Sequence, residues 1–298
     1  MDKKTAARVY ISAFLAMLFW GLSFIWTSIV LTYYPPITTI FLRLVLSASF
    51  LMVLLLIFGR LQKMQSRHLL LFLASAFFNP FLYFIGENYG VKLTTPSITA
   101  IMIATIPLFT PVAAYFMARE RLSMLNFAGI IISFFGVMVM IINPDLSFNL
   151  SSGGLLFLFL AVGSAVIYSV LLKKLTLYYK PSSIVAWQNL IGVFLFLPLF
   201  LGWEFDNFLA VVPDRRLISS LLFLAIFASS LAFILFTYTI KHLGISRANV
   251  YSNLIPVITA ITSYFVLDEM FSFGKIAGMV IVITGVVFTQ IKKHKNPI

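Results

Sequence analysis

Two charged residues stand inside long apolar stretches of this sequence, where ionisable side chains are rare and mostly functional. Arg43 lies in the second stretch and Glu87 lies near the end of the third. Holding a charge in lipid costs at least about 2.5 kcal/mol, so we expect the two to pair or to share a water-filled vestibule. There Arg43 can bind a substrate carboxylate, and Glu87 can take up a proton. The alternative is that each side chain snorkels to the interface independently.

Polar and aromatic side chains in the same stretches are the next candidates. Helical spacing places Trp20 and Ser23 on one face of the first stretch, and Asn79 and Tyr83 on one face of the third. Buried amides and hydroxyls need partners, so these groups either bind a substrate or join helix to helix. The predicted cavity residues are Trp20, Ser23, Asn79, Tyr83, Tyr168, Gln188, Asn249 and Asn253.

Motifs for catalysis are missing from the sequence. The three histidines, His68, His242 and His294, fall in or beside the connections between apolar stretches. The chain has no cysteine, no His/Asp/Glu group at metal-ligand spacing and no GxxxxGK[ST] sequence for nucleotide hydrolysis. We therefore predict no catalytic residue, no metal site and no cofactor, and we expect a protein that is not an enzyme.

Composition predicts the elements that carry these residues. Of the 298 residues, 61% are hydrophobic and only 10% are charged, which suits lipid as the solvent. The apolar runs match a hydrocarbon core of about 30 Å and lack the alternation of membrane β-strands. We predict an all-α integral membrane protein with ten transmembrane helices, over Tyr10–Leu31, Ile37–Phe58, Leu69–Tyr89, Ser97–Ala118, Leu125–Ile142, Leu155–Leu175, Ser183–Leu201, Leu217–Ile240, Ser246–Leu267 and Phe273–Ile291.

The distribution of basic residues orients these helices. The first stretch follows Lys3, Lys4 and Arg8, and it is longer than the apolar region of a signal peptide, so we expect it to be retained. Most of the 21 Lys and Arg residues fall in alternate connections on the side of the N-terminus. The positive-inside rule then predicts that both termini lie in the cytoplasm, in an inner membrane. The net charge of +12 is thus explained by topology, and we expect no nucleic-acid partner.

An internal repeat relates the two halves of the chain. Residues 149 positions apart coincide repeatedly, in the pairs Lys92/Lys241, Pro107/Pro256, Tyr115/Tyr264, Glu120/Glu269, Gly129/Gly278 and Gly136/Gly285. We predict two five-helix repeats, 1–149 and 150–298. Because five is odd, the second repeat must enter the membrane from the opposite side. Arg119 and Arg121 then face the cytoplasm, whereas Asp268 and Met270 replace them on the outer side.

Prolines and glycines inside the stretches have structural meanings. Pro107, Pro111 and Pro256 each free a carbonyl four residues back and bend the helix. The freed carbonyls either line a cavity or remain after a kink that fits the bundle. Gly129, Gly136, Gly278 and Gly285 form small-residue stripes that pack helices closely, either within one chain or across a homodimer.

Several motifs resemble the EamA-type permeases of the drug/metabolite transporter superfamily. They are LFWGLSF (18–24), IPLFTPVAAYFMARERLSMLNFAGIIISFFGV (106–137) and IPVITAITSYFVLDEMFSFGKIAGMVIVITGV (255–286). Gln188 also matches a recurrent position of that family. The second half departs from the pattern at its first helix, where Ser164 and Ala165 stand in place of a Trp-Gly pair. The resemblance implies transport of amino acids, other metabolites or toxic compounds.

Together these features predict a secondary transporter that exports or exchanges small metabolites by alternating access around a central cavity. Inverted repeats favour this mechanism, because exchanging the conformations of the two copies turns an inward-open state into an outward-open one. Amino acids are the leading substrate class. The alternatives are a membrane channel or a binding or scaffold protein without flux. The expected partners are a small-molecule substrate and the lipid bilayer.

Overall fold

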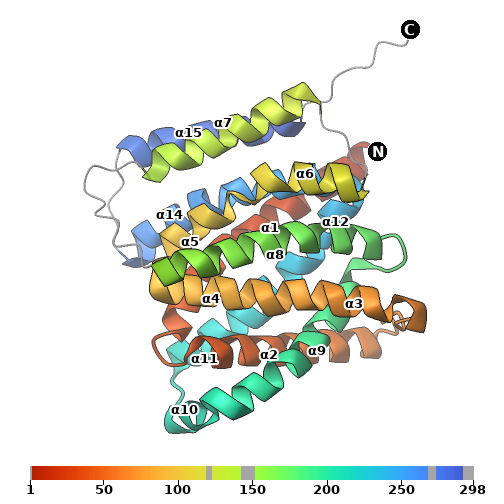
Figure 1. Ribbon diagram of the computed structural model, residues 1–298, viewed down its shortest axis with the longest axis vertical. Coiled ribbons are helices and arrows are strands. Elements are labelled where there is room, and N and C mark those ends of the chain that lie inside the picture. The colour runs from red at the N-terminus through yellow and green to blue at the C-terminus, as the bar shows by residue number, and fades with distance from the viewer. Residues whose placement is uncertain (1, 119–122, 142–151, 268–272, 291–298) are drawn as a thin grey trace.

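Helices make up nearly all of the computed structural model, which describes residues 2–118, 123–141, 152–267 and 273–290 (Figure 1). No β-strand occurs in these ranges, so the all-α prediction is confirmed. The repeated glutamates Glu120 and Glu269, with the charges beside them, lie outside the described residues.

In the first half of the chain, nine helices or helical parts among the described residues follow one another with short connections. Their bounds are α1 (Lys3–Val30), α2 (Pro36–Ile57), the 3-10 turn η1 (Ser66–His68), α3 (Leu69–Ala76), the π-helical segment η2 (Phe77–Leu82), α4 (Tyr83–Leu93), α5 (Pro96–Ile103), α6 (Ile106–Ala118) and α7 (Met124–Ile141).

The second half continues in the same manner. Its helices and helical turns are α8 (Ser152–Leu175), α9 (Pro181–Leu199), the π-helical segment η3 (Phe200–Glu204), α10 (Phe205–Ala210), α11 (Arg215–Phe223), the π-helical segment η4 (Leu224–Ala232), α12 (Phe233–Leu243), α13 (Ile245–Asn249), the 3-10 turn η5 (Val250–Asn253), α14 (Leu254–Leu267) and α15 (Phe273–Gln290).

Local sequence explains where several helices begin. Pro36, Pro96 and Pro181 each occupy the first position of a helix, where the missing N–H is not needed. The Thr95 side chain accepts a hydrogen bond from the Ile98 N–H and caps α5. Prolines and the Thr95 cap therefore favour helix starts at these positions through the local sequence.

Glu204 is a buried charge that the sequence prediction missed. The predicted seventh span ends at Leu201, but the helix continues through η3 and α10, which carries Glu204 into the bundle. Its carboxylate accepts hydrogen bonds from the Thr38 N–H at 2.6 Å, the Thr38 hydroxyl at 2.8 Å and the Ile37 N–H at 3.4 Å. These are unpaired donors at the start of α2, so Glu204 caps a helix from the other half of the chain.

Within the residues that the structure describes, seven helical segments are long and apolar enough to cross a membrane. They are Lys3–Val30, Pro36–Ile57, Ser66–Leu93, Pro96–Met117, Ser152–Leu175, Pro181–Ala210 and Arg215–Leu243. The other three predicted spans correspond to α7, to α13 with η5 and α14, and to α15. Two shorter apolar segments lie within α7 and α15, at Asn126–Gly136 and Ile276–Phe288. Large apolar side chains such as Leu70 and Phe116 face outward, as expected of a chain surrounded by lipid.

Two predicted proline kinks take a different form in the structure. The fourth span is interrupted at residues 104–105, so Pro107 lies in the first turn of α6 and only Pro111 lies in the helix interior. Pro256 lies in the first turn of α14, after the 3-10 turn η5. Because proline tolerates the first turn of a helix, the distortion falls before these two residues. A further interruption, at Asn79 and Pro80 in η2, was not predicted.

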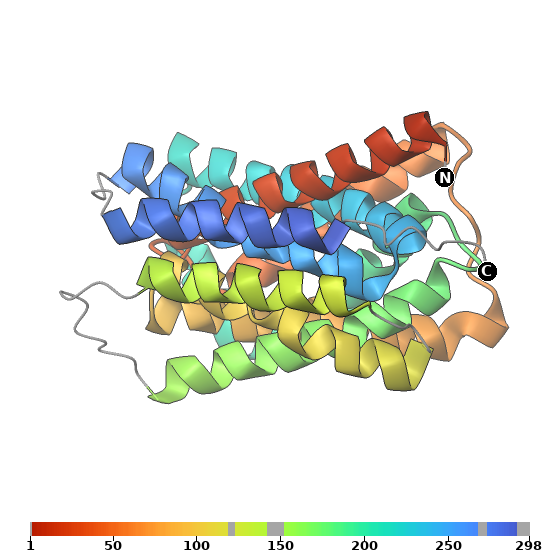
Figure 2. The ribbon, with the colours of Figure 1, turned by 90° about the horizontal axis from the view of Figure 1, so that it is seen from above.

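The helices run roughly along one axis, and α7 and α15 lie side by side at one end of the stack (Figures 1 and 2). A Cβ atom at Gly136 would lie 2.6 Å from the Val282 nitrogen and 2.8 Å from the Gly278 carbonyl oxygen, and one at Gly285 would meet Ser133. Ser133 of α7 lies against Gly285 of α15, whereas Gly136, further along α7, lies against Val282, which comes earlier in α15. The two helices are therefore antiparallel. The glycines thus allow close contact between helices of the same chain.

Candidate functional site

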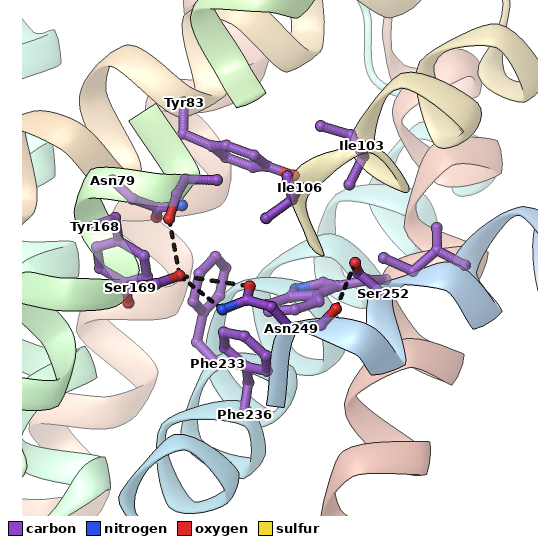
Figure 3. A pocket seen from close by; sticks show the side chains of 13 residues that line it. Asn79, Tyr83, Ile103, Ile106, Tyr168, Ser169, Phe233, Phe236, Asn249 and Ser252 are labelled. Atoms are coloured by element: carbon purple, nitrogen blue, oxygen red, sulfur yellow. Dashed lines mark hydrogen bonds between the residues drawn. The ribbon is translucent and has the colours of Figure 1, made fainter. Parts of the chain in front are cut away.

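A partly open cavity of about 40 Å³ lies between the two halves of the chain (Figure 3). The residues that line it come first from the N-terminal half, Trp20, Asn79, Tyr83, Ile103 and Ile106, and then from the C-terminal half, Ala165, Tyr168, Ser169, Phe233, Phe236, Asn249, Ser252 and Ile255. One water molecule needs roughly 10–15 Å³ on this scale. The cavity therefore holds a few waters, and a metabolite requires some lining side chains to move.

Five of the eight predicted cavity residues line this space. Asn79 and Tyr83 reach it from η2 and α4, Trp20 from α1, Tyr168 from α8 and Asn249 from α13. In Figure 3, Asn79 and Tyr168 lie on one side of the cavity, Tyr83 crosses above it, and Asn249 faces them. The structure thus brings together polar side chains from both halves of the sequence.

The other three predicted residues lie behind the cavity. The Ser23 hydroxyl donates to the Trp20 carbonyl on its own helix, at 2.7 Å. Gln188 accepts a hydrogen bond from the Tyr168 hydroxyl at 3.3 Å and donates to the Ser75 hydroxyl at 2.6 Å. Asn253 donates to Ser133 at 2.6 Å.

These contacts give the three residues helix-to-helix or local bonds in place of a direct position in the cavity. Gln188 holds Tyr168 and connects α8, α9 and α3. Asn253 instead joins η5 to the pair of α7 and α15, because Ser133 in turn donates to the Val282 carbonyl at 3.4 Å.

An aromatic cluster forms one wall of the cavity. The Trp20 ring packs edge to face on Phe233 and Phe236, with centroids 4.9 Å apart in each case. Its indole N–H donates to the Ala228 carbonyl at 3.2 Å. The sequence prediction missed both phenylalanines, because α12 offers no signal that separates a cavity-facing phenylalanine from a lipid-facing one.

Arg43 and Glu87 form an ion pair inside the bundle. The Arg43 Nη1 atom lies 3.5 Å from a Glu87 carboxylate oxygen, and the two residues are 1% and 5% exposed. Arg43 Nε donates to the Ser229 hydroxyl at 2.8 Å, and the guanidinium lies 4.1 Å from the centre of the Phe84 ring. The paired arrangement is therefore observed, in place of two side chains that snorkel independently.

A polar network continues from this pair between α2, α9 and η4. The Asn189 amide donates to the Ser47 hydroxyl at 2.6 Å and to the Ser229 carbonyl at 2.9 Å. Ser47 and Ser230 share a hydrogen bond of 2.7 Å. The π-helical geometry of η4 presents its serines to α2, and the signal in the sequence was the pair Ser229-Ser230 within an apolar stretch.

Metal-binding groups do not come together in the part of the chain that the structure describes. No set of three His, Asp or Glu side chains lies close enough to hold a metal ion within those ranges. The cavity itself is lined by amides, hydroxyls and aromatic rings, which are groups suited to bind a small molecule.

The fold and the cavity define a multi-pass, all-helical membrane protein with a cavity between its halves. A model described as the EamA-like transporter family matches residues 7–142 and 152–291. The chain therefore belongs to the EamA-like transporter family, and the resemblance of its motifs to EamA-type permeases is confirmed.

The curated relatives match this chain along nearly its full length. It is 27% identical over 299 residues to "Uncharacterized transporter YetK" of Bacillus subtilis (strain 168), covering 98% of this chain and 89% of that protein. An "Uncharacterized transporter" of Archaeoglobus fulgidus is 27% identical over 292 residues, covering 97% and 99%. A crystal structure of another protein, 18% identical, shares the fold with a TM-score of 0.77 and covers 95% of this chain and 98% of that one.

Proposed function

We propose that the protein is a secondary transporter that exports or exchanges small metabolites by alternating access. The observation that carries the proposal is one cavity lined from both family-matched segments, by Trp20, Asn79 and Tyr83 from the first and by Tyr168 and Asn249 from the second. Movement of one half against the other changes access to such a site. The cavity of about 40 Å³ is smaller than a metabolite, so a substrate enters only after the lining changes, which is compatible with a conformational cycle. Amino acids are the leading substrate class.

We further propose ten membrane spans arranged as two inverted repeats, 1–149 and 150–298. Support comes from the family model, which matches the chain twice, and from the antiparallel contact of α7 with α15. The hydrogen bond from Ser133 to Val282 joins positions 149 residues apart, where a two-fold axis between the repeats would pass. Figure 2 places the start of α1 and the end of α15 toward the same end of the bundle, which supports termini on one side of the membrane. The basic residues Lys3, Lys4 and Arg8 near the N-terminus favour the cytoplasmic side of an inner membrane.

Cysteine labelling tests this topology in a chain that has no natural cysteine. Met124→Cys and Phe273→Cys lie 149 positions apart, at the starts of α7 and α15, where the native side chains are 84% and 87% exposed. We expect a membrane-impermeant maleimide added to intact cells to label the second variant only, because the repeats are inverted. Both variants should react after permeabilisation. Labelling of both from the same face would refute the inverted repeat.

Counterflow in liposomes tests transport itself. A carrier gives saturable uptake that is accelerated by unlabelled substrate inside, a channel gives flux without this acceleration, and a scaffold gives no flux. The first substrates to use are amino acids.

Trp20→Ala should raise the half-saturating concentration for transport about tenfold, which corresponds to about 1.4 kcal/mol. The substitution removes a ring from the cavity wall. Trp26→Ala is the matched control, because Trp26 lies on the same helix and packs on Phe223 away from the cavity. Equal effects of the two substitutions, with both proteins folded, would argue against this cavity as the site.

Arg43 and Glu87 supply the proposed gating or proton-coupling step. A carboxylate carries protons in a transport cycle only if its surroundings change between conformations, and a fixed arginine partner favours the charged form. We propose that the ion pair breaks and re-forms during the cycle. Glu87 lies one helical turn after Tyr83 on α4, and Tyr83 lines the cavity, so a change at the cavity can reach the ion pair along a single helix.

A further inference from the structure

The cavity contains no ordinary partner for a charged ligand. None of its 13 lining residues is Lys, Arg, Asp, Glu or His. The buried charges Arg43 and Glu87 neutralise one another in an ion pair. The Phe84 ring covers the Arg43 guanidinium, and Phe84 in turn packs on the cavity residue Phe233 with centroids 6.1 Å apart. A ligand with a net charge would therefore lose its hydration without meeting an opposite charge.

Most polar groups in the cavity already have partners inside the protein. The Asn249 amide donates to the Ser169 hydroxyl at 3.1 Å and to the Ile245 carbonyl at 2.9 Å. Ser169 donates to the Ala165 carbonyl at 2.8 Å, and Ser252 donates to the Asn249 carbonyl at 2.7 Å. Dashed lines in Figure 3 mark the bonds that join Ser169 to Asn249 and Asn249 to Ser252. They fix the far wall of the cavity and leave it little capacity to bind a ligand.

Asn79 is the exception. It is 5% exposed and lines the cavity, yet its side-chain amide forms no hydrogen bond with any residue that the structure describes. Its backbone is extended, with φ −150° and ψ 119°, inside the π-helical segment η2. This local break in the helix turns the side chain toward the cavity (Figure 3). The amide atoms are accessible from the cavity and have no partner among the described residues, so their donors and acceptor are free to bind a ligand there.

We propose that Asn79 is the polar anchor of the site and selects substrates that carry no net charge. An amide offers donors and an acceptor side by side, which suits a carboxamide or the edge of an uncharged heterocycle. It also suits an amino acid with an uncharged side chain, because the ammonium and carboxylate groups lie next to one another and offset each other's charge. The apolar part of the substrate then lies against Trp20, Phe233 and Phe236. This inference rests on the proposed transport function and narrows its substrate class to net-neutral molecules.

Matched ligand pairs that differ chiefly in charge provide the test. The pairs are glutamine with glutamate, norleucine with lysine, and uracil with orotate. Binding to the purified full chain is measured by the shift in its unfolding temperature, and transport is measured by counterflow in liposomes. We expect each neutral member to bind, and its charged partner to bind at least about tenfold more weakly.

Variants of Asn79 show whether this residue sets the preference. Asn79→Leu should weaken binding of the neutral ligand at least about tenfold. Asn88→Leu is the matched control, because Asn88 is a buried amide on α4 that donates to the Phe84 carbonyl and does not line the cavity. Should Asn79→Leu fail to fold, Asn79→Asp keeps the shape of the side chain, and it should favour lysine over norleucine.

The outcomes separate the two proposals. Saturable flux of a charged member as fast as its neutral partner, or unchanged selectivity in the Asn79 variants, overturns the inference while transport stands. Binding of neutral ligands without flux supports the inference and counts against transport. No binding and no flux with any member counts against both.

Discussion

Arg43→Met is expected to destabilise the protein by about 3 kcal/mol or more, since removing one partner of a buried ion pair leaves the other charge uncompensated. Arg43 and Glu87 are both almost fully buried. Besides its ion pair with Glu87, Arg43 contacts the Ser229 hydroxyl and the Phe84 ring. The measurement is the midpoint of denaturant unfolding in detergent micelles. Arg60→Met is the control, because Arg60 is exposed and its loss should change little.

The double variant Arg43→Met with Glu87→Gln separates the pair from its surroundings. It removes both charges, so it should recover a large part of the stability lost in Arg43→Met. Strongly non-additive effects in the double-mutant cycle are the expected sign of a direct interaction. Additive effects of the two substitutions would show that the pair contributes nothing as a unit.

Transport by the Glu87→Gln variant addresses proton coupling. If Glu87 takes up a proton during the cycle, the variant should lose the pH dependence of the wild-type rate, because glutamine cannot titrate. A wild-type rate and pH profile in this variant would leave Glu87 with a structural role only. This result would not affect the stability prediction for Arg43.

The sequence predicted the features that depend on local composition or on the cost of polarity in lipid. Apolar runs of membrane length produced the helical spans, and the charges Arg43 and Glu87 were paired because an isolated charge in lipid is expensive. Trp20 and Tyr168 were placed in a cavity on similar grounds. Each of these inferences needs only the type of the residue, its position along the apolar span and the cost of placing a polar group in lipid.

Features that depend on which buried face a side chain occupies were not predictable. Asn253 bonds to Ser133 instead of lining the cavity, and Phe233 lines the cavity although it resembles any lipid-facing phenylalanine. Glu204 was left outside the predicted span because charged residues normally end one. The structure offsets its charge with the free N–H groups at the start of α2, a partner about 170 residues away along the chain that helical periodicity cannot reveal.

Gly285→Ala is expected to separate α7 from α15 and to destabilise the protein by roughly 1–3 kcal/mol, the usual cost of overpacking. The added methyl group would meet the backbone of Ser133, which cannot move as a flexible side chain can. Gly136→Ala should have a similar effect, since its methyl group would lie 2.6 Å from the Val282 nitrogen. Thermal unfolding of the purified variants provides the measurement.

Gly163→Ala is the matched control for the crowded glycines. Gly163 also lies in a helix, α8, but a methyl group there meets nothing within 4 Å. Alanine favours a helix over glycine by about 1 kcal/mol, so this variant should be as stable as the wild type or more stable. If Gly285→Ala behaves like Gly163→Ala, the close contact of α7 and α15 is not needed for stability. If only the crowded glycines are intolerant, the small-residue stripe that the two repeats share holds them together within one chain.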